Sequence, residues 1–175
     1  MEETTELLAR RVIEKYRAGG LTVAAAESCT GGMIAAYLTD IPGSSAVFAG
    51  ACVTYTNAVK ERLLGVDPET VARETEVSHA CAREMAEGVR KRIGTDVSVS
   101  ATGYAGPGGG TERDPVGTVY IGWSTADTVG SERFCAPAGA DRAGVREAAA
   151  HRALEILAAL EILAALGEEQ RHGTE

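Results

Sequence analysis

Two short segments, Leu21–Ala26 and Asp96–Ala101, limit the possible folds more than any other feature of the sequence. Both have the length of a strand rather than of a helix, and neither has a charged residue in its interior. Segments of this kind are typical of strands that are buried on both faces of a sheet. A chain with two such strands needs helices to cover both faces of the sheet that holds them.

Helical and hairpin patterns surround these two segments. Residues 5–18 place apolar side chains at helical spacing and stop at a glycine pair, and a longer helical pattern covers residues 141–166. Residues 116–124 and 128–136 have the pattern of two strands in an antiparallel hairpin. Strands that alternate with helices, together with one hairpin, predict an α/β fold. We expect a single layered α/β/α domain with a mixed, mostly parallel sheet and a long C-terminal helix.

The length and the charge balance narrow the function. The 175 residues suit one domain, which we place at residues 1–167, followed at residues 168–175 by a polar tail that we expect to be disordered. Acidic residues outnumber basic ones by 25 to 17, and the net charge is −8. This balance argues against a nucleic-acid partner, because broad binding needs lysine and arginine to neutralise phosphates. It still allows a small anionic ligand in one local pocket.

The cysteines and histidines do not suggest a metal site or a disulfide framework. None of the four cysteines forms a C-x-x-C pair, and the three histidines are scattered along the chain. We therefore expect free thiols in a reducing compartment, and no metal or other cofactor. Residues 1–11 are charged and helix-like, without the apolar core of a secretion signal, so we expect a cytoplasmic protein.

A tandem repeat marks the C-terminal helical pattern. The sequence LEILAA occupies residues 154–159 and again residues 160–165. This repeat does not match the helical period, so the apolar face rotates around the helix. Charged residues at Arg152, Glu155 and Glu161 argue against a membrane span. The surplus apolar surface instead predicts a homo-oligomer, either a dimer or a trimer.

Ser28 lies in a short turn between a predicted strand and the next helix. The turn reads ESCTGG from residue 27 to residue 32. Backbone N–H groups at a helix start carry positive partial charge and can bind an anion. Ser28 is therefore a candidate nucleophile, with the N–H groups of Thr30 and Gly31 as an oxyanion hole. Two alternatives remain open: Ser28 is a plain helix cap, or Cys29 is the nucleophile.

Lys60 and Tyr55 follow the next predicted strand. A serine nucleophile needs a base, and no histidine lies in a motif-like stretch. Lys60 can serve as the base if burial lowers its pKa toward neutrality, and Tyr55 could relay the proton or orient Lys60. The alternative is an ordinary exposed lysine on a helix that begins at Ala58.

A glycine-rich loop at residues 102–115 resembles an anion cradle. Successive glycines let backbone N–H groups converge on a phosphate, although the loop lacks the ending of a P-loop and the spacing of a dinucleotide motif. Arg142 and Arg146 lie one helical turn apart and could grip a phosphate or carboxylate. The alternative for both arginines is a solvated helix face. The candidate binding residues of the loop are Gly103, Gly106, Gly108 and Gly109.

Together these segments resemble the CinA C-terminal domain family over about residues 5–155. The matching segments are AESCTGG at 26–32, PGSS at 42–45, VTYTN at 53–57 with Lys60, TGYAGPGG at 102–109 and PVGTVY at 115–120. The resemblance implies a stand-alone amidase domain that converts nicotinamide mononucleotide to nicotinate mononucleotide and ammonia. It assigns catalysis to Ser28, Tyr55 and Lys60. It assigns substrate contacts to Thr102 and Arg142.

The residues and the resemblance lead to one scheme. Lys60 takes the proton of Ser28 directly or through Tyr55, Ser28 attacks the amide, and the loop with Arg142 holds the ribose phosphate. Tyr104 stands where the family usually has a small aliphatic residue, so we expect its ring in the pocket wall. Two other functions remain open. One is a module that binds a nucleotide without hydrolysing it, and the other is an interaction protein linked to DNA uptake or repair.

Overall fold

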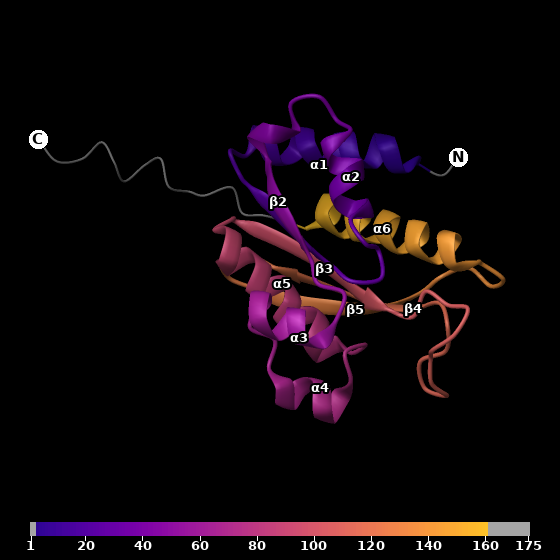
Figure 1. Cartoon of the computed structure of the whole chain (residues 1–175). Helices are drawn as coiled ribbons and strands as arrows, with labels where there is room; N and C mark the ends of the chain where they lie inside the picture. Colours follow the sequence, from indigo (N-terminus) through magenta and orange to yellow (C-terminus); the bar gives the residue numbers. More distant parts are fainter. Residues whose placement is uncertain (1–2, 161–175) are drawn as a thin grey trace, which may run out of the picture.

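A five-stranded sheet forms the centre of the structure, a computed structural model that describes residues 3–160 (Figure 1). The strands are β1 (Val23–Glu27), β2 (Phe48–Val53), β3 (Val97–Gly103), β4 (Thr118–Ser124) and β5 (Val129–Cys135). They lie in the order β2-β1-β3-β4-β5. β1 pairs in parallel with β2 and β3, whereas β4 pairs antiparallel with β3 and β5. Within the described sheet only β4 runs against the other strands, which confirms the mixed, mostly parallel prediction.

Helices cover both faces of this sheet, which confirms the predicted α/β/α layering (Figure 1). One face is covered by α1 (Thr5–Ala18), α2 (Met33–Thr39) and α6 (Arg142–Ala159). The other face is covered by α5 (His79–Ile93) and by the π-helix η2 (Lys60–Leu64), which continues directly from α3 (Asn57–Val59). α4 (Pro68–Glu74) packs against α5. A 3-10 turn, η1 (Ser44–Ala46), precedes β2. Each face has its own apolar core.

Small side chains in the sheet let α5 lie close against it. The buried hydroxyls of Ser98 and Ser100 on β3 donate to the carbonyl oxygens of Ala86 and Ala82 on α5, both at 2.6 Å. These bonds satisfy polar groups that would otherwise be unpaired in the core. On β4, a Cβ at Gly122 would lie 2.2 Å from the Ala82 carbonyl oxygen. A larger residue at this position would therefore push the helix away from the sheet.

The C-terminal helix is shorter than its sequence pattern. α6 ends at Ala159, whereas the pattern extends to residue 166. Lys15 of α1 donates from Nζ to the carbonyl oxygens of Ala158 at 2.7 Å and Leu160 at 2.6 Å. It thus supplies a donor to carbonyl groups at the C-terminal end of α6, which have no partner within the helix. Most of the second LEILAA copy and the predicted tail lie outside the described residues, and the homo-oligomer stays a prediction. Among the described residues, no helix is both long and apolar enough to cross a membrane.

Candidate active site

The chain turns where β1 ends, and Ser28 is the first residue after the strand. Its N–H donates to the Ala101 carbonyl oxygen at 2.9 Å, which continues the pairing of β1 with β3. Gly31 and Gly32 follow with φ values of 62° and 102°, which glycine adopts at little cost. Gly32, not Ser28, occupies the N-cap position of α2. The helix-cap interpretation of Ser28 is therefore wrong.

The carboxylate of Glu27 holds this turn. It is fully buried and accepts hydrogen bonds from the N–H groups of Gly32 at 2.9 Å, Ile34 at 3.1 Å and Ala35 at 2.9 Å. A negative charge at a helix start is stabilised by the partial positive charge of these groups. Glu27 has no role in the sequence-based prediction. An acidic residue between an apolar strand and a helix is the signal that could have identified it.

Arg146 of α6 holds the same turn by donating hydrogen bonds to carbonyl groups of the turn. Nε donates to the Cys29 carbonyl oxygen at 3.1 Å, and Nη2 donates to the Thr30 carbonyl oxygen at 3.0 Å. These bonds occupy Nε and Nη2, so Arg146 supports the turn in this structure, and its contact with an anionic ligand stays a prediction. The turn that presents Ser28 is fixed by Glu27 at its N–H groups and by Arg146 at its carbonyl groups.

Lys60 is buried beside Ser28. It begins the π-helix η2, a rare element that is frequent at functional sites, and is only 1% exposed. Nζ lies 3.1 Å from Ser28 Oγ and 3.0 Å from the Thr54 carbonyl oxygen. Burial lowers the pKa of Lys60, although the negative charge of Glu76 opposes this shift. Lys60 is therefore not an exposed helix lysine, and its contact with Ser28 is the geometry that a serine–lysine pair needs.

The thiol of Cys29 is a poorer candidate nucleophile than the Ser28 hydroxyl. Burial raises the pKa of Cys29 to about 12, and the nearby backbone N–H groups and Lys60 offset this only in part. The thiol therefore keeps its proton near neutral pH, whereas a reactive cysteine acts as the thiolate. Ser28 stays the candidate nucleophile.

The predicted oxyanion hole is only partly available. The N–H of Gly31 donates to the Ser28 carbonyl oxygen at 3.1 Å, so this group is occupied within the turn and its predicted role is wrong for this conformation. The N–H of Gly32 is occupied by Glu27. Among the described residues, the N–H of Thr30 has no backbone acceptor. Thr30 is the candidate that remains from the original pair, but it is fully buried, and neither Thr30 nor Gly31 is among the described residues that line the cavity beside Ser28.

Tyr55 contacts Arg142 rather than the serine–lysine pair. Its side chain is 59% exposed, and its hydroxyl accepts a hydrogen bond from Arg142 Nη2 at 2.9 Å. The other end of the guanidinium donates to the Gly106 carbonyl oxygen. In the described structure, no hydrogen bond joins Tyr55 to Ser28 or Lys60. The geometry therefore favours direct proton transfer between Ser28 and Lys60 over a relay through Tyr55.

Ser28 and Lys60 line a cavity of about 240 Å³ that gathers most of the predicted site. The predicted residues in its wall are Ser28, Tyr55, Lys60, Thr102, Gly103, Gly106, Gly108 and Arg142. The wall also contains Cys29, Asn57, Glu76, Val77, Tyr104 and Ala105. Tyr104 thus lies where its bulk predicts. Gly109 is absent from the described wall and faces the Tyr104 ring, with a Cβ position 3.4 Å from Cδ1, so its predicted substrate contact is not supported.

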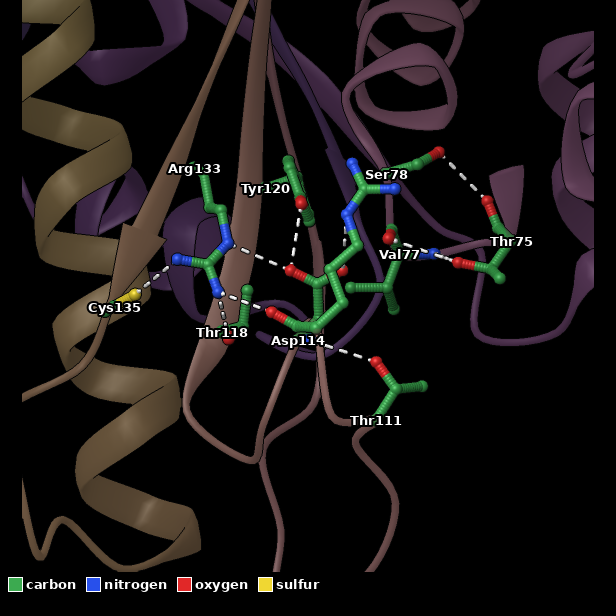
Figure 2. Close-up of polar contacts among 10 residues, drawn as sticks. Thr75, Val77, Ser78, Thr111, Asp114, Thr118, Tyr120, Arg133 and Cys135 are labelled. Carbon is green, nitrogen blue, oxygen red and sulfur yellow. Dashed lines mark hydrogen bonds and ion pairs between the residues drawn. The ribbon is translucent and has the colours of Figure 1, made fainter. Parts of the chain in front are cut away.

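Asp114 anchors the glycine-rich loop to the sheet (Figure 2). Its Oδ1 accepts hydrogen bonds from Tyr120 Oη on β4 and from Arg133 Nε on β5, both at 2.9 Å. Thr111 and Asp114 also close the loop on itself. The N–H of Thr111 donates to the Asp114 carbonyl oxygen at 2.8 Å, and the N–H of Asp114 donates to Thr111 Oγ1 at 2.9 Å. The loop that forms part of the cavity wall is thus tied to both strands of the hairpin.

Replacing Asp114 with asparagine is expected to weaken this anchor. Burial alone would raise the pKa of Asp114, but hydrogen bonds from Arg133 and Tyr120 outweigh it and hold the pKa below its ordinary 3.8. The charged group therefore stabilises the fold above that value, and the stabilisation is lost as pH falls through the lowered pKa. At pH 7, Asp114→Asn should lower the free energy of unfolding by about 1–2 kcal/mol. Urea denaturation at neutral pH and near pH ~3 checks this, because the difference should shrink in acid; an equal loss at both would contradict it.

The comparisons with known proteins agree on one family. The model of the CinA C-terminal domain matches residues 5–160. The CinA-like protein of Myxococcus xanthus (strain DK1622) is 49% identical over 154 residues, which cover 87% of this chain and 36% of that protein. The CinA-like protein of Parasynechococcus marenigrum (strain WH8102) is 46% identical over 156 residues, which cover 88% of this chain and 37% of that protein. The chain thus spans about a third of the length of these curated relatives.

Solved structures share the fold over nearly the whole chain. The competence/damage inducible protein CihA from Agrobacterium tumefaciens has a TM-score of 0.85 and 41% identity, covering 90% of this chain and 95% of its own. The competence damage-inducible protein A (ComA) from Klebsiella pneumoniae subsp. pneumoniae MGH 78578 has a TM-score of 0.85 and 34% identity, covering 89% and 96%. With a family model that matches most of its length, the chain belongs to the CinA C-terminal domain family.

Proposed function

We propose that this domain hydrolyses the carboxamide of nicotinamide mononucleotide to nicotinate mononucleotide and ammonia, with Ser28 as the nucleophile. The observation that carries the proposal is the buried contact of Lys60 Nζ with Ser28 Oγ at 3.1 Å in the cavity wall. Burying a lysine costs free energy, and a pocket that only binds a nucleotide has no need of one beside a serine hydroxyl. Membership of the CinA C-terminal domain family supports an amidase, and the nucleotide substrate follows from the family resemblance of the motifs.

In the first half of the proposed reaction, neutral Lys60 accepts the proton of Ser28 while Oγ attacks the carboxamide carbon. The N–H of Thr30 is the candidate donor to the oxyanion of the tetrahedral intermediate. As the C–N bond breaks, Lys60 returns the proton to the leaving nitrogen, and ammonia departs. In the second half, water attacks the ester carbon, Lys60 accepts a proton from it, and the proton passes to Ser28 Oγ as the acid is released. One water is consumed for each ammonia formed.

Arg142 and the glycine-rich loop are the proposed phosphate site. Arg142 is the first residue of α6 and lines the cavity together with Gly106 and Gly108. A guanidinium supplies a permanent charge and a fork of donors that match phosphate oxygens. Its contacts with Tyr55 and Gly106 hold it in position before any ligand binds. Tyr55 therefore orients Arg142 in this proposal rather than moving a proton.

Arg142→Ala is expected to raise the KM for nicotinamide mononucleotide about 10–100-fold, with a smaller change in kcat, because a phosphate contact is made in both ground state and transition state. Nicotinamide riboside is the matched control substrate, since it has the same amide and ring but no phosphate. Its KM should change by less than about 3-fold. An equal loss with both substrates would contradict the phosphate contact and leave Arg142 as a support for the cavity wall.

Ammonia release on adding nicotinamide mononucleotide tests the proposed activity. The wild-type domain should release ammonia and nicotinate mononucleotide in equal amounts over many turnovers. If a folded domain bound the nucleotide and released no ammonia, the nucleotide-binding module would replace the amidase as the better account. The distinction matters because binding needs Arg142 and the loop but not the pair of Ser28 and Lys60.

A further inference from the structure

Glu76 is the one acidic side chain among the described residues that line the cavity. It lies between α4 and α5, in a segment that the proposed mechanism does not use. We infer that Glu76 makes the cavity selective for amides carried on a cationic ring, so that the site takes the oxidised pyridinium nucleotide in preference to its reduced, uncharged dihydropyridine form. This inference rests on the proposed function and adds the ring chemistry that the site selects.

The backbone that carries Glu76 is strained and held on both sides. Thr75 has φ 73° and ψ 167°, a conformation that is a genuine outlier for a β-branched residue and that persists only where its surroundings enforce it. Thr75 Oγ1 bonds both backbone groups of Val77 at 3.2 Å, and Ser78 Oγ donates to the Thr75 carbonyl oxygen at 2.9 Å (Figure 2). From β3, Thr102 Oγ1 donates to the Glu76 carbonyl oxygen at 2.7 Å. These contacts fix Glu76 at the cavity wall.

The charges in the cavity suit a ligand that carries both signs. With Lys60 neutral, as the proposed mechanism requires, the described wall holds one negative group, Glu76, and one positive group, Arg142. In the described structure these two form no ion pair with each other, and the partners of Arg142 are the uncharged oxygens of Tyr55 and Gly106, so neither charge is neutralised by the other. A pyridinium nucleotide places a positive ring and a negative phosphate in one molecule. A dihydropyridine nucleotide has the same shape and phosphate but lacks the ring charge.

The position of Glu76 also connects ring charge to the catalytic pair. Its carboxylate is close enough to raise the pKa of Lys60. The pKa of Tyr104 is raised mainly by burial, and the Glu76 carboxylate adds to that shift. A cationic ring beside Glu76 would offset the field that favours protonated Lys60. Tyr104 lies in the same wall and packs against Val77 and Tyr120, and an aromatic ring attracts a cation through its face. A charged ring would therefore bind more tightly than an uncharged one, and it would also help to keep Lys60 neutral.

Binding to a Ser28→Ala background tests this inference without turnover. Calorimetry should give a Kd for oxidised nicotinamide mononucleotide at least about 10-fold lower than for the reduced nucleotide. Adding Glu76→Gln should weaken the oxidised ligand about 10-fold or more and change the reduced ligand by less than about 3-fold. Adding Glu76→Asp should restore part of the preference. Glu74→Gln is the matched control, because Glu74 is exposed at the end of α4 and lies outside the described cavity wall.

Each outcome separates this inference from the amidase proposal. Equal weakening of both ligands by Glu76→Gln would mean a structural role and would overturn the charge selection. Equal binding of both nucleotides before any change at Glu76 would overturn it too, even if the wild type releases ammonia. Charge-selective binding by a protein that releases no ammonia would support the inference and contradict the amidase. If neither nucleotide bound the folded Ser28→Ala protein, the inference would be wrong.

Discussion

Ser28→Ala is expected to lower the kcat for ammonia release from nicotinamide mononucleotide by about 10³-fold or more. The serine hydroxyl is the atom that would form the acyl-enzyme, and Cys29 next to it is held as a neutral thiol by burial, so no neighbouring group can replace it. The turn is held by Glu27 and Arg146 through contacts that do not include the Ser28 hydroxyl. The variant should therefore fold and bind the nucleotide as the wild type does. Coupled measurement of ammonia, with nucleotide binding followed by calorimetry, checks both statements.

A matched serine change separates chemistry from general disturbance. Ser45 is exposed in η1 and lies outside the described cavity wall, so Ser45→Ala should keep the wild-type rate. If Ser28→Ala retained more than about a tenth of wild-type kcat, a covalent route through Ser28 would not be tenable. Water would then have to attack the amide directly, with Lys60 as its base.

Lys60→Met should abolish turnover to a similar extent, about 10³-fold in kcat, because it removes the base and keeps the volume of the side chain. Methionine removes the amine from the core but leaves the Thr54 carbonyl oxygen without its donor, so thermal unfolding should show a loss of no more than about 1–3 kcal/mol. Lys60→Arg is the informative companion, since arginine keeps donors near Ser28 but cannot lose its proton. Both variants should be inactive if Lys60 acts as a base. Activity in Lys60→Arg alone would show that Lys60 acts only as a fixed charge.

The pH dependence of the wild type provides a separate check on Lys60. A general base works in its deprotonated form, so kcat/KM should rise with pH and level off above the pKa of Lys60. Burial lowers that pKa from its ordinary 10.5, and the rise should therefore be complete below the range of an exposed lysine. Weakening the opposing field with Glu76→Gln should move the inflection to lower pH. An inflection near 10.5 in the wild type would contradict a buried neutral lysine.

The layers of the fold were predictable because they follow from local patterns. The buried strands β1 and β3 and the hairpin of β4 and β5 each show in a few consecutive residues. The end of α6 was less predictable, because Lys15 of α1 bonds the carbonyl groups there and lies far away in the sequence. The local pattern near residue 160 contains no sign of that contact.

The candidate site was predictable as a set of residues but not as a geometry. Ser28 and Lys60 each have a local signal, yet their 3.1 Å contact depends on the parallel pairing of β1 with β2 and on the π-helix that follows. For the same reason, the occupation of Arg146 by the turn could not be inferred from its spacing to Arg142. Glu76 has no local signal, because an acidic residue between two helices is ordinarily solvated. The position of Glu76 becomes notable only in the structure, where the backbone of the preceding Thr75 is strained.

The most direct measurement is the mass of the Ser28 peptide after rapid quenching of the domain during turnover of nicotinamide mononucleotide. The account predicts that this peptide gains the mass of the substrate less ammonia, that the adduct disappears when substrate is exhausted, and that Ser28→Ala shows none. In the Lys60→Met variant, any adduct that forms should also be on Ser28. Steady ammonia release with an unmodified Ser28 peptide, and with undiminished turnover in Ser28→Ala, would contradict the account.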